Sequence, residues 1–129
     1  MLKKILIKAQ VSGAIPYLIR AYCDWIEDNK FTPYLLVNTK GLGVVIPEGF
    51  DANGKMVLNI GSSATEGRTI NNEAISFKAR FQGKTQKIVV PCDAVLSIYA
   101  KENGEGMFFD NNKTSPKEED KKPNLTILD

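Results

Sequence analysis

The spacing of hydrophobic positions changes near Pro33. Before it, residues 16–29 carry large apolar side chains that recur at i, i+4, i+7 and i+8, namely Leu18, Tyr22, Trp25 and Ile26. This spacing predicts one apolar face of an α-helix. Pro16 suits the first helical turn and Asn29 suits the end of the helix. The apolar face packs either on the domain's own core or on a second copy of the chain, and periodicity leaves both open.

After Pro33 the pattern is typical of short β-strands. Alternation is cleanest at residues 74–81, with Ile75, Phe77, Ala79 and Phe81 on one face and Ser76, Lys78 and Arg80 on the other. Strands are also predicted at residues 34–39, 44–46, 55–60, 85–90 and 107–109. Residues 96–101 fit a helix or a strand, and the glycine-containing turn that follows favours a strand. The chain is therefore predicted to be mainly β with an N-terminal helix, as a small barrel or sandwich.

Turns and loops separate these strands. Asn53-Gly54 is a hairpin-turn dipeptide, residues 61–67 form a loop of small side chains, and residues 92–95 form a short helical turn. Asp93, beside Cys92, is better suited to capping that turn than to acid catalysis.

The composition changes at both ends of the chain. Residues 110–122 contain no large apolar side chain and are predicted to be a flexible linker. The last residues, 123–129, regain large aliphatic side chains, as a strand that folds back or as a motif that docks on a partner. The apolar run at 5–7 is too short for a signal peptide. Residues 1–15 are expected to be a disordered arm, and a wrongly chosen upstream start codon is the alternative.

Charge and residue types narrow the chemistry. The 129 residues include 17 Lys and Arg, 15 Asp and Glu and no histidine, for a net charge of +2. This near-neutral balance has no basic stripe and disfavours nucleic acid as a partner. The lack of histidine removes the commonest general base and the commonest zinc ligand. With no phosphate loop and no serine elbow, the chain is predicted to be a binding module and not an enzyme, without metal or cofactor.

The compartment is expected to be the cytoplasm. Cys23 and Cys92 are far apart in the chain, and two buried thiols are favoured over a disulfide. No segment approaches the ~18 apolar residues of a membrane span, so no membrane association is expected.

Four segments together resemble the SspB family, also called stringent starvation protein B, whose members are adaptors of the ClpXP protease. They are PYLIRAYCDWIEDNKFTPYLLVN at 16–38, MVLNI at 56–60, FKARF at 77–81 and VPCDAVLSIYAKENGEGMFF at 90–109. The resemblance covers residues 16–109 and implies a small Sm-like or SH3-like β domain. In the family the N-terminal helix forms much of a homodimer contact, which implies that Leu18, Tyr22, Trp25 and Ile26 lie at or near an interface.

The resemblance also implies a groove for the ssrA tag, the peptide added to stalled nascent chains. The positions that would bind it are Asn59, Ser63, Ala64, Thr65, Phe77, Lys78, Ala79, Arg80 and Phe81. A strand with an apolar face and a cationic face suits an extended peptide, and Arg80 can bond a carboxylate or a carbonyl. Without the resemblance, Arg80 would be interpreted as part of a solvated strand face.

The C-terminal residues resemble the family's module for the N-terminal zinc domain of the ClpX unfoldase. The residues that would dock are Lys121, Lys122, Pro123, Leu125, Ile127 and Leu128, and the zinc belongs to the partner. Two features depart from the family: the linker is short, and residues 1–14 have no recognised counterpart. The rival hypothesis is an Sm-like RNA-binding protein, which predicts a basic stripe and strongly salt-dependent affinity.

Overall fold

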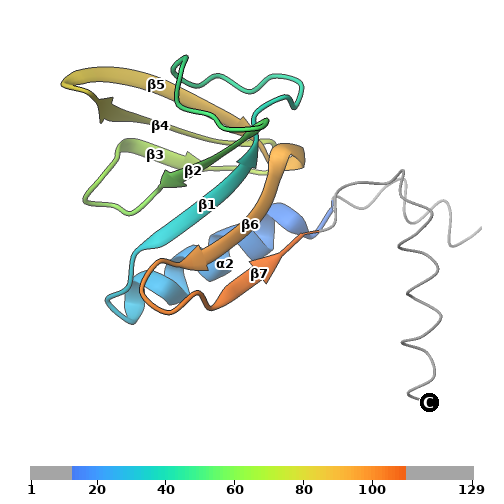
Figure 1. The fold of residues 1–129 in the computed structure, drawn as a ribbon. Coiled ribbons are helices and arrows are strands. Elements are labelled where there is room, and N and C mark those ends of the chain that lie inside the picture. Colours follow the sequence, from blue (N-terminus) through green and yellow to red (C-terminus); the bar gives the residue numbers. More distant parts are fainter. Residues whose placement is uncertain (1–12, 110–129) are drawn as a thin grey trace, which may run out of the picture.

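The computed structural model describes residues 13–109, which form one α-helix, a short 3-10 helix at Cys92–Ala94 where a helical turn was predicted, and two antiparallel sheets (Figure 1). Helix α2 spans Ile15–Asp28. The first sheet has the order β2-β1-β6-β7, with β1 at Pro33–Asn38, β2 at Lys55–Asn59, β6 at Val95–Ala100 and β7 at Gly106–Phe108. The second sheet has the order β3-β4-β5, with β3 at Glu66–Ile70, β4 at Ala74–Phe81 and β5 at Lys84–Pro91. The predicted class, mainly β with an N-terminal helix, is confirmed.

Helix α2 begins and ends close to the predicted residues. A proline lies in its first turn, where no N–H partner is needed. At the other end the side-chain amide of Asn29 donates to the Trp25 carbonyl at 2.8 Å. The helix contacts β6, β1 and β3, so it covers one side of the core.

The core lies between the two sheets and α2. It collects the inward positions of the strands, led by Leu35, Val37, Ile75, Phe77, Ile88, Val90, Val95 and Ile98, and the inner face of α2, Ile19, Cys23 and Ile26. Each fully buried aliphatic side chain stabilises the fold by roughly 1.5–3 kcal/mol relative to exposure. Phe109 is also buried, so the folded core extends to the last described residue.

The cysteines are two free thiols that are both buried, as predicted. Burial is the main cause that raises the pKa of Cys23 to about 11, which keeps this thiol protonated at neutral pH. Within residues 13–109, no helix is long and apolar enough to cross a membrane.

Two predictions about the strands were wrong. Residues 44–46 do not form a strand: Val45 alone bridges to Val89, because Gly43 has a φ of +85° on one side and Pro47 ends any ladder on the other. Strand β3 was not predicted, since its sequence EGRTI is polar and its residues are exposed or half-buried.

Strand β2 pairs along its length with β1, and Asn53-Gly54, both at positive φ, make the tight turn before it.

Candidate peptide-binding groove

Within residues 13–109, two strand edges that pair with no further strand border the same groove. β2 is the outer strand of the first sheet and pairs with β1 on one side only. β4 pairs with β5 as far as Phe81↔Lys84, whereas its last pair with β3 is Glu66↔Lys78. Within the described residues, the main chain of β4 beyond Lys78 is therefore paired on one side only. Such an edge offers N–H and C=O groups to an added strand.

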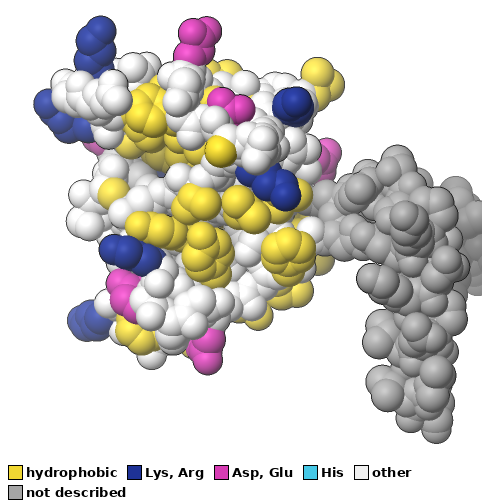
Figure 2. Space-filling view, viewed as in Figure 1, with side chains coloured by type: hydrophobic (Ala, Val, Ile, Leu, Met, Phe, Trp, Pro, Cys, Tyr) yellow, Lys and Arg dark blue, Asp and Glu magenta, His cyan; other side chains and the backbone are white. Residues whose placement is uncertain are grey.

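The groove between these edges has a volume of about 500 Å³. Its walls come from β1, β2, the β2–β3 loop and β4, and its lining residues are Tyr34, Val57, Leu58, Asn59, Ala64, Ala79, Arg80 and Phe81. Most of these side chains are apolar or aromatic, and Arg80 carries the single charge among them. The space-filling view of this side of the molecule shows apolar side chains gathered across its middle and in the hollow above (Figure 2).

The alternation predicted for β4 is confirmed, and it explains the apolar floor. Ile75 and Phe77 are buried, whereas Ala79 and Phe81 on the same face are half-buried. The strand thus continues past the end of the closed core, and the face that packs the core becomes the floor of the groove. Arg80 is exposed, and its guanidinium donates to the Gly83 carbonyl at 3.2 Å.

Five of the nine predicted binding positions line this groove: Asn59, Ala64, Ala79, Arg80 and Phe81. Phe77 is 3% exposed and belongs to the core. Lys78 lines a separate hollow with Glu66, Gly67, Ser76, Phe77 and Lys87. Ser63 is exposed, and Thr65 donates its hydroxyl to the Gly61 carbonyl at 3.0 Å.

Sequence reasoning missed Tyr34 and left Val57 and Leu58 only as neighbours of the site. Tyr34 pairs with Asn59 across β1 and β2, and this register carries it to the groove. Val57 is 43% exposed although Met56 and Leu58 on either side are buried. The signal in the sequence that could have identified Val57 was a β-branched residue at an outward position of an edge strand.

An aromatic contact joins the loop before β2 to Phe81 of the groove. Phe50, in the loop before β2, lies with its ring centroid 5.1 Å from that of Phe81, at an interplanar angle of 58°. The contact holds the 47–52 loop over the end of β4. Phe50 is 37% exposed, so the loop keeps an open apolar side.

The outer face of α2 carries the predicted dimer residues, with one exception. Leu18 and Tyr22 are half-buried and Trp25 is 46% exposed. The rings of Tyr22 and Trp25 meet edge to face at 5.7 Å, beside a hollow of about 270 Å³ that they line with Ala21. Ile26 is 1% exposed and packs in the core of its own domain. The helix thus has an inner apolar face that includes Ile26 and an outer apolar face that includes Tyr22 and Trp25. The sequence pattern assigned these residues to one face.

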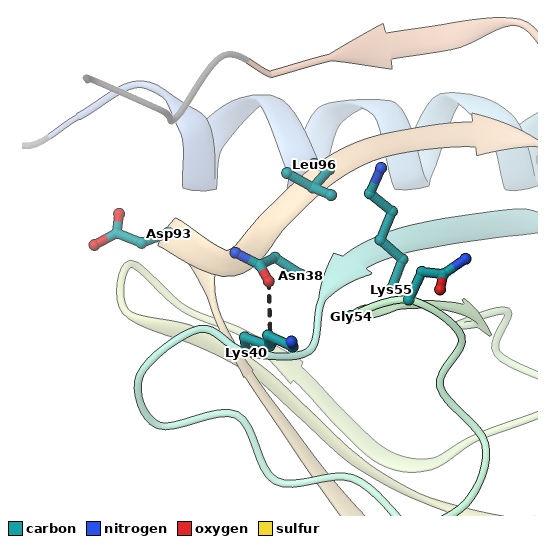
Figure 3. Close-up of a pocket in the computed structure, with 7 residues that line it drawn as sticks. Asn38, Lys40, Gly54, Lys55, Asp93 and Leu96 are labelled. Atoms are coloured by element: carbon teal, nitrogen blue, oxygen red, sulfur yellow. Dashed lines mark hydrogen bonds between the residues drawn. The ribbon is translucent and has the colours of Figure 1, made fainter. Parts of the chain in front are cut away.

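A further pocket, at the far end of β1, is polar. Lys40, Asn53, Lys55 and Asp93 line it with Asn38, Gly54 and Leu96. Figure 3 shows that the Asp93 carboxylate points away from Lys55, and the hydrogen bond drawn runs from the Lys40 N–H to the Asn38 side chain at 3.0 Å. These polar side chains do not converge on one point, so the groove beside β4 is the better candidate site.

The predicted unfoldase-docking residues, Lys121 to Leu128, lie outside the described residues, as do the predicted linker and residues 1–12 of the predicted N-terminal arm. The arm was predicted to be disordered as far as residue 15, which is wrong at its end, because Ile15 is the first residue of α2.

The fold and groove define a class: a two-sheet β domain with one packed helix and an apolar groove between two strand edges. The family model of stringent starvation protein B matches residues 13–126. A relative described as "Stringent starvation protein B homolog", from Haemophilus influenzae, is 47% identical over 95 residues, which cover 74% of this chain. The chain belongs to the stringent starvation protein B family. It spans 63% of the length of that relative.

Proposed function

We propose that the chain is a non-catalytic adaptor that binds ssrA-tagged polypeptides and tethers them to the ClpX unfoldase for degradation by ClpXP. The observation that carries the proposal is the groove, in which an apolar floor and one cation lie between two unpaired strand edges. The family membership adds weight, because the sequence resemblance implies the same activity.

The groove suits an extended peptide. A peptide laid along Ala79–Phe81 can pair its main chain with the open side of β4, as an added strand. Alternate peptide side chains then point down, toward Val57, Ala79 and Phe81. Arg80 at the rim can form a charge-assisted hydrogen bond with a carboxylate or a main-chain carbonyl of the tag.

The composition of the groove favours binding over catalysis. Its lining residues contain no cysteine, aspartate or glutamate, and the whole chain contains no histidine. These are the side chains that general acid–base catalysis uses most often, within hydrogen-bond reach of the reacting atom. The single positive charge also gives little support to RNA, which requires several phosphate contacts.

Delivery follows from tethering. The tail residues Lys121 to Leu128 would dock on the zinc domain of ClpX while the groove holds the tag, so that two modest contacts raise the local concentration of substrate. The outer face of α2, with Tyr22 and Trp25, would join two copies into a homodimer. The two free thiols fit a reducing cytoplasm, where this delivery would occur.

The proposal is tested by degradation of an ssrA-tagged reporter by purified ClpXP at low substrate concentration. The intact chain is expected to accelerate degradation, and a chain ending at Phe109 is expected to bind the reporter without accelerating its degradation. An intact chain that leaves the rate unchanged, although it binds the tag, would contradict the delivery role.

A further inference from the structure

We propose that Glu27 and Arg68 are positioning residues that hold the loop at residues 61–65 as one wall of the groove, and so set its affinity for peptide. The inference rests on the proposed function. Glu27 lies on α2 and does not line the groove, so it would act on the groove through the loop.

The two side chains reach the loop from different elements. The Ser62 N–H donates to the Glu27 carboxylate on α2 at 2.6 Å. Arg68 on β3 donates to the Ile60 carbonyl at 2.6 Å and to the same carboxylate at 3.3 Å. The hydrogen bonds from Ser62 to Glu27 and from Arg68 to the Ile60 carbonyl are shorter than the contact between the two side chains. The pair therefore acts chiefly by anchoring backbone just before and within the loop.

The anchored segment is continuous with the groove. The Gly61 N–H donates to the Asn59 side chain at 2.9 Å, and Asn59 lines the groove. The Ala64 N–H and the Thr65 hydroxyl both donate to the Gly61 carbonyl, at 3.0 Å each. These bonds make the loop one compact turn, so a shift at Ser62 is passed to Ala64, which faces the groove.

The space around Gly61 is too small for the turn to shift freely. A Cβ built at Gly61 would lie 3.1 Å from the Asn59 side-chain oxygen and 3.8 Å from the Glu27 carboxylate. The loop is thus enclosed between β2 and α2. Releasing it from Glu27 is expected to open the wall, because it would lose an anchor on its α2 side.

The Glu27–Arg68 pair, called the clamp below, is not the main contact that holds α2 to the domain. Arg68 on β3 and Glu27 near the end of α2 are 20% and 23% exposed, whereas Ile19, Cys23 and Ile26 pack the helix on the core. A second arginine, Arg20, also ties α2 to β3, through the Ile70 carbonyl at 3.0 Å, at the end of β3 away from the loop. Arg20 is therefore a matched control for Arg68.

Glu102 is the matched control for Glu27. Its carboxylate accepts the Thr32 N–H at 2.8 Å and the Thr32 hydroxyl at 2.7 Å, outside the groove lining. Glu102→Ala therefore removes a carboxylate that anchors main chain in the same way, at a place where the groove does not depend on it.

The experiment titrates a fluorescent ssrA-tag peptide with the full chain and its variants, and follows amide hydrogen exchange of Ser62 and Ala64. Glu27→Ala and Arg68→Ala are expected to raise Kd about tenfold, the worth of a hydrogen bond to a charged group. Glu27→Gln keeps an acceptor for Ser62 and is expected to raise Kd less, by about threefold. Exchange at Ser62 is expected to be faster in all three variants, and Arg20→Ala and Glu102→Ala are expected to change neither quantity.

Unchanged Kd in Glu27→Ala and Arg68→Ala would overturn the inference, and so would an equal loss of affinity in the two controls. A wild-type chain that does not bind the peptide would defeat the proposed function itself. In that case the exchange measurement still tests the clamp. Exchange at Ser62 that is the same in the wild type and in Glu27→Ala and Arg68→Ala would overturn it, whereas faster exchange in these variants would support Glu27 and Arg68 as the anchor of the loop.

Discussion

Lys78 lies opposite Glu66, and this is the last pair between β4 and β3 before β4 runs on beside β5 alone. The end of the ladder creates the site. Up to Lys78 the inner face of β4 packs a closed core. Beyond it, the same alternation presents Ala79 and Phe81 to a groove that is open to solvent.

The first prediction concerns the floor of the groove. Ala79→Leu adds three carbons to a half-buried position, and they would occupy the space that a peptide side chain needs. Overpacking of this kind costs about 1–3 kcal/mol, so the Kd for the tag peptide is expected to rise at least about fivefold. The melting temperature is expected to stay near that of the wild type, because the added atoms enter the open groove. Ala14→Leu, at the exposed residue before α2, is the control, and an unchanged Kd in Ala79→Leu would contradict the assignment of the floor.

The second prediction concerns the aromatic contact at Phe81 of the groove. Phe50→Ala removes the ring that lies 5.1 Å from Phe81 and loosens the 47–52 loop. Aromatic pairs are worth about 1 kcal/mol beyond their buried area, so affinity for the peptide is expected to fall about fivefold. Phe31→Ala is the matched control, because Phe31 is 36% exposed and Phe50 is 37% exposed, and among the described residues it is the Phe50 ring, not that of Phe31, that contacts Phe81. Equal binding by the two variants would show that the loop plays no part in holding the peptide.

The third prediction concerns self-association. Trp25→Glu places a charge at the centre of the outer face of α2, where a dimer contact would bury it without a partner. Loss of a central interface aromatic costs at least about 2 kcal/mol, so the dimer is expected to weaken at least about 30-fold. Sedimentation velocity measures this, with Leu42→Glu, at a loop residue that is 95% exposed, as the control. A wild-type chain that sediments as a monomer, or a dimer that survives Trp25→Glu, would reject this face as the interface.

The fourth prediction concerns pH. Burial opposes ionisation of Glu27, but its hydrogen bonds with Ser62 and Arg68 outweigh burial and hold the pKa of its carboxyl below the ordinary 4.5. The groups around it are Arg68 on β3 and, on its own helix, Asp24 and the Cys23 thiol. A lowered native pKa means that the stabilisation is complete above the unfolded value and is lost as pH falls through the native pKa.

The difference in unfolding free energy between wild type and Glu27→Gln measures this effect. It is expected to be largest at neutral pH and to shrink below about pH 4.5, the ordinary value for glutamate. Glu102, whose pKa is also lowered by its bonds with Thr32, titrates alike in both proteins and cancels. A difference that grows on acidification would mean that Glu27 is not stabilised in its ionised form.

The sequence predicted the parts of the fold that depend on local periodicity. The bounds of α2 and β4 were found almost to the residue, because a capped helix and a strand of period two carry strong signals. Strand β3 was missed because EGRTI carries no apolar alternation and is held by pairing with β4. Its Arg68 nevertheless anchors the loop, a role that no local pattern could reveal.

The candidate site was predicted in part for the same reason. Ala79, Arg80 and Phe81 belong to one recognisable segment, whereas Tyr34 and Val57 reach the groove only through the register of β1 on β2. Phe77 and Lys78 belong to the same FKARF segment, but the core buries the first and the second lines a different hollow. The FKARF segment therefore identified the strand. Which of its residues are open to a ligand depends on where the pairing between β3 and β4 ends.

The most direct test of the central claim is fluorescence anisotropy of a labelled ssrA-tag peptide titrated with the intact chain, Arg80→Ala and a chain ending at Phe109. The intact and shortened chains are expected to bind alike, and Arg80→Ala is expected to bind at least about tenfold more weakly, since it loses a charge-assisted hydrogen bond. Absence of saturable binding by the intact chain at micromolar concentrations, or equal binding by Arg80→Ala, would contradict the assignment of this groove as the tag-binding site.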